Sequence, residues 1–191
     1  VETSQRLVDA LLGAFAQIFP HKIPAASCGS MNNILFGGQT EEGEKQNFVH
    51  YETIGGGHGA SPSQHGASAM QTHMTNTLNT PIEDLERLFP VRIMRYSLAP
   101  FTQPDLTENS GGAGVIRHYK FLTNTKVTLL GDRQKIPPYG LNGARAGKLR
   151  TTKLIRGNET PKPIHSKAYL HLKPGDELEI TTAGGGNHAS G

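Results

Sequence analysis

The sequence predicts an α+β fold with two helices in its first half and a β-rich second half that contains hairpins and long Gly/Pro loops. Three observations support this prediction. Apolar residues recur at helical spacing near the N-terminus, a helix-start signature stands at residues 80–83, and short alternating segments separated by turn residues fill the second half. Helices and strands that occur in separate runs along a chain are typical of α+β proteins.

The first helix is expected over residues 4–19. Apolar residues with helical spacing define it: Leu7, Leu11, Leu12, Phe15, Ile18 and Phe19. This spacing gives an amphipathic helix with one apolar face. Thr3 or Ser4 is expected to cap its start, and Pro20 ends the pattern.

The second helix is expected to follow Thr80, which would serve as its N-terminal cap. Pro81 would occupy the first helical position, where the missing N–H costs nothing, and Glu83 would complete a capping box. Pro90 ends this helix.

Strands are expected at 34–36, 48–54, 91–98, 115–122, 126–130, 153–156, 168–172 and 177–181. The short Thr-Asn-Thr segment at 123–125 indicates that two of these strands form a hairpin. We expect two parts along the chain: residues 1–98, with a glycine-rich loop and the capped helix, and residues 110–191, which are β-rich.

Charge and cysteine content narrow the function classes. The 191 residues carry a formal net charge of +3, spread along the chain rather than in a basic stripe, so nucleic-acid binding is not expected. No apolar run is long enough to span a membrane. The single cysteine, Cys28, cannot form an internal disulfide, which favours a reducing compartment such as the cytoplasm, and it is expected to be a buried packing residue.

The most informative feature is a set of glycine clusters, since the chain has 23 glycines without a collagen repeat. Four motifs contain or accompany them: Tyr-Glu-Thr-Ile-Gly-Gly-Gly-His-Gly-Ala at 51–60, His-Met-Thr-Asn-Thr at 73–77 leading to Pro-Ile-Glu-Asp-Leu-Glu at 81–86, Ser-Gly-Gly-Ala-Gly at 110–114, and Asp-Arg at 132–133 followed by Pro-Pro-Tyr-Gly-Leu-Asn-Gly at 137–143. In this order they resemble the C-terminal region of the hydantoinase B/oxoprolinase family. The resemblance covers nearly the whole chain.

The resemblance implies an α+β piece of a B-type subunit in an enzyme that opens a cyclic amide (5-oxoproline, a hydantoin or a lactam) with ATP. A second possibility from the same family is a component of an ATP-dependent acetone or acetophenone carboxylase. A third is a module that serves assembly and carries no catalytic group. The opening at Val1 inside a helical pattern indicates a split, cleaved or truncated chain, which we expect to be inactive alone.

The family also implies the cofactors and partners. An A-type subunit would bind ATP and Mg²⁺, and the N-terminal part of the B-type subunit, outside this sequence, would hold any Zn²⁺ or Mn²⁺. The two departures from the family pattern are His118-Tyr119 after Arg117, where Gly-Gly is common, and Ala144 after Gly143. Both put close backbone approaches in those loops in doubt.

Three histidines are the candidate catalytic residues: His58, His65 and His73. Imidazole groups suit general acid/base chemistry near neutral pH, whereas the plainer interpretation is that they are hydrogen-bonded loop residues. Their spacings of seven and eight match no short metal motif, so no metal site is predicted in this chain.

The candidate substrate-binding residues are Gly56, Gly57, Asn76, Asp132 and Arg133. Glycines let backbone N–H groups converge on a carboxylate or a phosphorylated intermediate, although close backbone packing explains them equally well. Asp132 and Arg133 follow an apolar strand, where they would either face the substrate or form a salt bridge that anchors a loop.

Overall fold

The computed structural model describes residues 1–40, 46–101, 104–105 and 107–189. It confirms the α+β class, with helices α1 (Glu2–Ile18) and α2 (Ile82–Leu88) beside antiparallel sheets. The strands of the described residues are β1 (Asn33–Gln39), β2 (Asn47–Thr53), β3 (Val91–Leu98), β4 (Glu108–Asn109), β5 (Val115–Phe121), β6 (Thr125–Leu130), β7 (Thr151–Ile155), β8 (Lys162–Pro163), β9 (Lys167–Leu172), β10 (Glu177–Thr181) and β11 (His188–Ala189).

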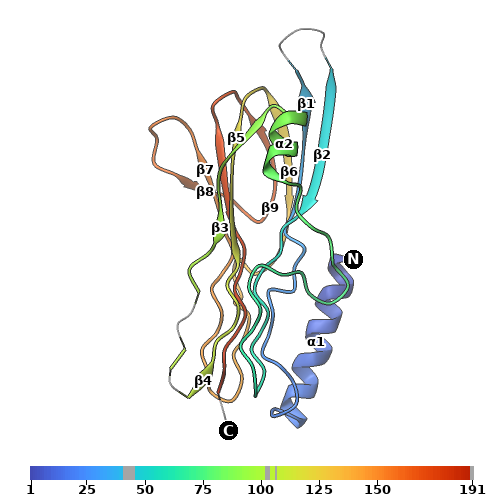
Figure 1. Cartoon of the computed structure of the whole chain (residues 1–191), viewed down its shortest axis with the longest axis vertical. Coiled ribbons are helices and arrows are strands. Elements are labelled where there is room, and N and C mark those ends of the chain that lie inside the picture. Colours follow the sequence, from blue (N-terminus) through green and yellow to red (C-terminus); the bar gives the residue numbers. More distant parts are fainter. Residues whose placement is uncertain (41–45, 102–103, 106, 190–191) are drawn as a thin grey trace.

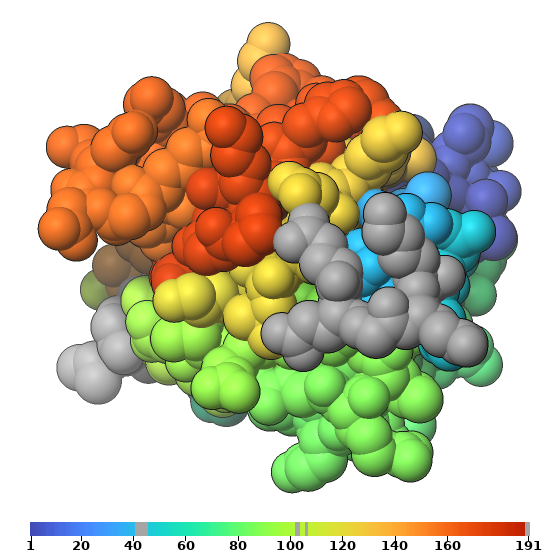
Figure 2. Space-filling model, turned by 90° about the horizontal axis from the view of Figure 1, so that it is seen from above, coloured from blue at the N-terminus to red at the C-terminus, as the bar shows by residue number. Residues whose placement is uncertain are grey.

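Two sheets enclose the core in the upper half of Figure 1. One has the strand order β2-β1-β6-β9 and the other β3-β5-β10-β7-β8, while β4 pairs with β11. Alternating residues of both sheets fill the core, among them Phe36, Val127, Tyr119, Phe121 and Leu178. Figure 2 looks onto this end, where β7 and β8 (orange) lie on one side and the green segment of α2 on another.

The expected hairpin of the 115–122 and 126–130 strands is wrong. β5 pairs with β3 and β10, whereas β6 pairs with β1 and β9, so the connection crosses from one sheet to the other. Two-residue hairpin turns need positive φ, and none of residues 122–125 adopts it. Segments 1–98 and 110–191 contribute strands to both sheets, and the expected division into two parts stays a prediction about the order along the chain.

Helix α1 lies where the spacing predicts, but its orientation is reversed from that of an ordinary amphipathic helix. Gln5, Asp9 and Ala16 are its buried residues, whereas Leu7, Leu11, Phe15 and Ile18 are exposed. The cap prediction is also wrong, because the N-cap is Val1 and no side chain caps the helix.

The second cap prediction is wrong by one residue. Helix α2 begins at Ile82 with Pro81 as its N-cap, and no side chain makes a capping hydrogen bond. Thr80 is held elsewhere: its N–H donates to Glu52 (3.4 Å) and its carbonyl accepts from Arg117 (3.1 Å). These bonds tie Thr80 to strands β2 and β5 instead of to the first turn of the helix.

Beside helix α1, the lower half of Figure 1 contains extended segments that run side by side with few strand assignments. We call this region the glycine bundle; its segments are 24–28, 55–60, 66–70, 110–114, 138–147 and 183–187. Backbone hydrogen bonds connect them, for example Gly112 N–H to His58 O (2.8 Å) and Gly185 N–H to Gly112 O (2.9 Å). A Cβ on Gly185 would lie 1.8 Å from the carbonyl oxygen of His58, so only glycine allows this approach.

Cys28 is buried within this bundle, as predicted. Among the described residues, no helix combines the length and apolar character needed to cross a membrane.

Candidate functional site

Four charged side chains meet where α1 packs against the glycine bundle, and we call them the Asp9 cluster. They are Arg6, Asp9, His73 and Arg133. One carboxylate oxygen of Asp9 lies 2.7 Å from His73 Nε2, and the other lies 2.5 Å from Arg6 Nη2 and 2.6 Å from Arg133 Nη2. Arg6 and Asp9 are three residues apart on α1, a spacing that places them on one face.

Backbone geometry holds the other two members in place. His73 has φ +55° and Arg133 has φ +66°, both in the left-handed region that non-glycine residues rarely adopt. The Arg133 guanidinium also donates to the carbonyls of Cys28 (3.0 Å) and Ser27 (3.2 Å). Strained backbone of this kind tends to occur at functional sites, which supports a role for this cluster.

The cluster keeps Asp9 ionised. Burial alone would raise the pKa of Asp9, but the hydrogen bond from His73 and the guanidinium groups of Arg6 and Arg133 outweigh it, and the pKa is lowered. An ionised carboxylate only accepts hydrogen bonds, so His73 Nε2 carries a hydrogen and donates it in the hydrogen bond to Asp9. In neutral imidazole the other nitrogen, Nδ1, is then left as a proton acceptor.

A cavity of about 190 Å³ lies beside this pair, lined by Asp9, His58, His73 and Tyr139 together with Leu12, Thr72 and residues 24–27. His58 Nε2 lies 2.9 Å from the carbonyl oxygen of Gln71. Burial, and then the nearby Asp9, raise the pKa of Tyr139, so its hydroxyl stays protonated. The cavity thus combines a carboxylate-oriented imidazole, a second imidazole and a phenol, an arrangement capable of proton transfer.

The structure separates the three predicted histidines. His58 and His73 line the same cavity. His65 is exposed, and its Nδ1 accepts a hydrogen bond from the backbone N–H of Ser110 at 2.9 Å. Asn76 is exposed and lines a different hollow of about 270 Å³ with Thr77, Asn79 and Tyr96 among others. The catalytic role of the three histidines and the substrate-binding role of Asn76 stay predictions.

Gly56 and Gly57 lie inside the glycine bundle. Their N–H groups donate to the carbonyls of Met70 (3.2 Å) and Ala183 (3.0 Å), so these two amides are not available to an anion. A Cβ on Gly57 would lie 1.9 Å from the carbonyl oxygen of Gly112. Close backbone packing, the plainer of the two interpretations, therefore describes both positions, and substrate binding there stays a prediction.

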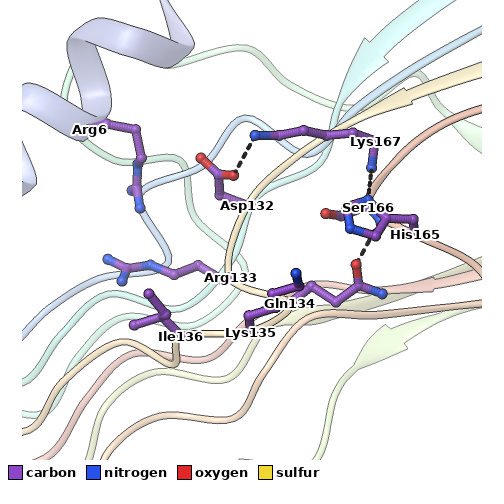
Figure 3. Close-up of a pocket in the computed structure, with 9 residues that line it drawn as sticks. All are labelled: Arg6, Asp132, Arg133, Gln134, Lys135, Ile136, His165, Ser166 and Lys167. Atoms are coloured by element: carbon purple, nitrogen blue, oxygen red, sulfur yellow. Dashed lines mark hydrogen bonds and ion pairs between the residues drawn. The ribbon is translucent and has the colours of Figure 1, made fainter.

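Asp132 and Arg133 follow β6, but their side chains point to different partners. Asp132 pairs with Lys167 (3.0 Å), and Arg133 pairs with Asp9. Figure 3 shows the hollow that both residues line, with Arg133 directed towards Arg6. Each residue forms a salt bridge, and only Arg133 reaches the Asp9 cluster.

Three residues of this candidate site were not among those predicted from the sequence: Arg6, Asp9 and Tyr139. Gln5 and Asp9 lie four residues apart on one face of α1, which is the usable signal, whereas Leu7, Leu11 and Ile18 lie on its exposed face.

A second polar cluster, also unpredicted, lies in the core between the sheets. Arg117 Nε lies 2.8 Å from Glu52, Tyr119 donates to the same carboxylate, and Asn79 donates to it at 3.1 Å. Burial acts to raise the pKa of Glu52, but His50, Arg117, Tyr119 and Asn79 lower it to about 2. His50, Glu52, Arg117 and Tyr119 are buried and Asn79 is half-buried, so we interpret the cluster as a structural connection between β2 and β5.

The described residues contain no group of three or more His, Cys, Asp or Glu side chains placed to hold a metal ion. Within this part of the chain, the side chains present therefore do not fit the cation that the family implies.

The comparisons with known proteins point in one direction. The family model for hydantoinase B/oxoprolinase matches residues 1–189. The chain is 37% identical to 5-oxoprolinase 1 of Arabidopsis thaliana, over all of this chain and 14% of that protein. Curated relatives of this kind are longer, since the chain spans about a third of their length or less.

Two solved structures share the fold. The ATP-dependent caprolactamase from Pseudomonas jessenii matches with a TM-score of 0.69 and 21% identity, over 90% of this chain and 31% of that one. A nucleotide-free acetone carboxylase matches with a TM-score of 0.63 and 14% identity, over 91% of this chain and 27% of that one.

Proposed function

Because the chain belongs to the hydantoinase B/oxoprolinase family, we propose that it forms part of an ATP-dependent enzyme that opens a cyclic amide such as 5-oxoproline, a hydantoin or a lactam. The names of the Arabidopsis relative and of the caprolactamase support this reaction class. The chain would work together with the remaining two-thirds or more of the relatives' length, supplied by the same or another polypeptide.

The observation that carries the proposal is the Asp9–His73 pair at the edge of a cavity. In ring opening, water must add to the amide carbon. We assign His73 Nδ1 the role of base: it takes a proton from water as the new C–O bond forms. When the C–N bond breaks, the same proton returns to the leaving nitrogen. Asp9 orients the imidazole and stabilises its charged form, as a carboxylate does in other catalytic pairs.

Tyr139 and His58 would complete the cavity. The Tyr139 hydroxyl stays protonated and is a hydrogen-bond donor for the amide oxygen or for negative charge that develops on it. His58, which lines the same cavity, would help to position the substrate. A donor aimed at developing charge in a water-poor cavity is worth about 3 kcal/mol in comparable enzymes.

ATP and Mg²⁺ belong to the A-type partner in this proposal, where the γ-phosphoryl group of ATP would be transferred to the amide oxygen with release of ADP. Loss of the ring nitrogen would then leave an acyl phosphate, and a second water would release inorganic phosphate and the ring-opened acid. The sequence has no Gly-Lys-Ser/Thr phosphate loop, and the amides of Gly56 and Gly57 are engaged within the chain. Zn²⁺ or Mn²⁺, where required, would bind the N-terminal part of a B-type subunit.

Helix α1 provides the surface for that remaining part. Leu7, Leu11 and Ile18 are 62%, 58% and 68% exposed, and they form an apolar stripe that the described part of this chain leaves mostly uncovered. The buried face of the same helix carries Asp9, so a partner that packs on the stripe would fix the position of the catalytic carboxylate.

A second candidate is a component of a ketone carboxylase, favoured by the shared fold of acetone carboxylase. A base at His73 would there remove a proton from the carbon next to the carbonyl. The third candidate, an assembly module, would leave the Asp9 cluster without a chemical role.

The test is turnover by the assembled enzyme with ATP. We expect ADP, inorganic phosphate and the ring-opened acid in equal amounts from 5-oxoproline, a hydantoin or caprolactam, and none of these products from this chain alone. Incorporation of labelled bicarbonate into acetone or acetophenone, without amide hydrolysis, would instead establish the carboxylase. Unchanged turnover after alanine replacement of both His58 and His73, with assembly intact, would support the assembly module.

A further inference from the structure

A hollow of about 450 Å³ lies at the end of β6, and we call it the basic pocket. Figure 3 shows its lining, which comes from helix α1 (Arg6), the segment 132–136 and the segment 165–167. The proposed ring-opening step uses no residue of this pocket directly, although Arg6 and Arg133 line it and also pair with Asp9.

Positive charge exceeds negative charge in this pocket. Arg6, Arg133, Lys135 and Lys167 line it, and Asp132 is the lining carboxylate. Asp132 pairs with Lys167, and Asp9 is shared by the two arginines, so two carboxylates face four cations. Lys135 is exposed and forms no ion pair with any residue that the structure describes.

Arg150 adds a further buried cation next in sequence to β7, connected to the pocket segment through its backbone. Its N–H donates to the Arg133 carbonyl (2.9 Å), and its side chain is fully buried. None of its three guanidinium nitrogens has a hydrogen-bond partner among the described residues. Burial lowers its pKa to about 10, which still leaves the group charged at neutral pH. A buried cation without an acceptor favours an anion nearby.

Arg133 is fixed for binding. Its Nε and Nη2 donate to Cys28, Ser27 and Asp9, and its side chain is only 9% exposed. Nη1 takes part in none of these bonds. A guanidinium held in this way loses little freedom when it binds a planar or tetrahedral oxyanion.

We propose that the basic pocket binds a small oxyanion, a carboxylate or a phosphate group, through Arg133 Nη1, Lys135 and Lys167. The anion replaces the missing negative charge at the end of β6 and lies next to the Asp9 cluster. It comes either from a carboxylate on the substrate or from phosphate. The proposal stands on the charges of the pocket and does not depend on the ring-opening reaction.

The experiment is titration calorimetry of the assembled enzyme with inorganic phosphate and, separately, with 5-oxoproline against 2-pyrrolidinone, its neutral counterpart without the carboxylate. Lys135→Glu is compared with Lys126→Glu, which makes the same change of charge at an exposed position within β6. Lys167→Gln, at a residue with a half-exposed side chain, is a second variant that removes a pocket charge.

We expect saturable binding of one of the two anions, weakened about tenfold by Lys135→Glu and unchanged by Lys126→Glu, because only the first reversal places negative charge beside the ligand. Phosphate binding that depends on Lys135 would identify phosphate as the source. Binding of 5-oxoproline but not of pyrrolidinone would identify the substrate carboxylate. Equal effects of the two lysine variants, or no Lys135-dependent binding of either anion, would overturn the proposal.

Discussion

At the scale of single residues, the position of Asp9 decides what the site can do. It receives hydrogen bonds from His73, Arg6 and Arg133, so three segments distant in the sequence converge on one carboxylate. Removing one partner of such a buried group leaves the others uncompensated, which costs about 3–5 kcal/mol in comparable proteins. Substitutions in the Asp9 cluster are therefore expected to lower the stability of the fold as well as the proposed activity.

The polar cluster around Glu52, which contains Arg117, Tyr119 and Asn79, leads to a prediction about stability in acid. The pKa of Glu52 is about 2 in the folded chain against 4.5 as the ordinary value, so the folded state favours the carboxylate. This contribution is present above pH 4.5 and is lost as the pH falls towards 2. Its size is about 3 kcal/mol from the usual 1.4 kcal/mol per pKa unit. Denaturant unfolding measured between pH 7 and pH 2 checks it.

Glu52→Gln should flatten that loss of stability, and Tyr119→Phe, which keeps the Glu52–Arg117 pair, should reduce it in part. Glu159→Gln is the matched control, because Glu159 is an exposed partner of Lys162. Parallel pH curves for wild type and Glu52→Gln would show that Glu52 does not carry the effect.

Part of the site could be predicted from the sequence. His58, His73 and Arg133 belong to the motifs singled out there, and the structure brings them to one cluster and its cavity. Arg6 and Asp9 were missed because contacts between distant segments leave no periodic signal, and Tyr139, although part of the 137–143 motif, was given no role from the sequence. Asp9 in particular lies on a helix whose apolar residues indicated the opposite buried face.

At the scale of elements, strand positions were predictable and strand partners were not. The alternation of β6 identified the strand, but alternation is the same for a hairpin and for a strand that crosses to a facing sheet. The glycine bundle shows the same limit. The motifs marked its segments, whereas their mutual packing depends on approaches of backbone to backbone that only the folded chain contains.

The bundle gives an element-scale prediction from two glycines that differ in available space. A Cβ on Gly57 would lie 1.9 Å from Gly112 O, and one on Gly184 would lie 3.1 Å from the same atom. Gly57→Ala must shift backbone and should cost more than about 3 kcal/mol or prevent folding, in the range of severe overpacking. Gly184→Ala should cost clearly less.

Thermal or denaturant unfolding of the two variants measures this difference directly. Equal stability of Gly57→Ala and Gly184→Ala would mean that the segments do not pack as closely as described.

At the scale of the whole molecule, helix α1 carries Asp9 on its buried face and, in our proposal, contacts the remaining part of the enzyme through its exposed face. Leu11 and Phe15 are 58% and 48% exposed, so replacing both with Ser should leave the stability of this chain nearly unchanged. The double variant should lose association with the remaining part of the enzyme, since burying the exposed half of two such side chains is worth about 2–3 kcal/mol. Co-purification with tagged partner chains checks both expectations.

Gln17→Ser on the same helix is the control, because Gln17 is polar and exposed. Retained association in the Leu11/Phe15 variant would place the partner on another surface.

The central claim is that His73, oriented by Asp9, moves the proton during ring opening. The most direct measurement is the single-turnover rate of amide hydrolysis by the assembled enzyme with His73→Gln, beside His171→Gln, an exposed histidine on β9. Loss of a general base costs about 10²–10⁴-fold, so we predict a fall of at least about 100-fold for His73→Gln with ATP binding intact, and no change for His171→Gln. A His73→Gln enzyme that assembles and hydrolyses the amide at the wild-type rate would contradict the claim.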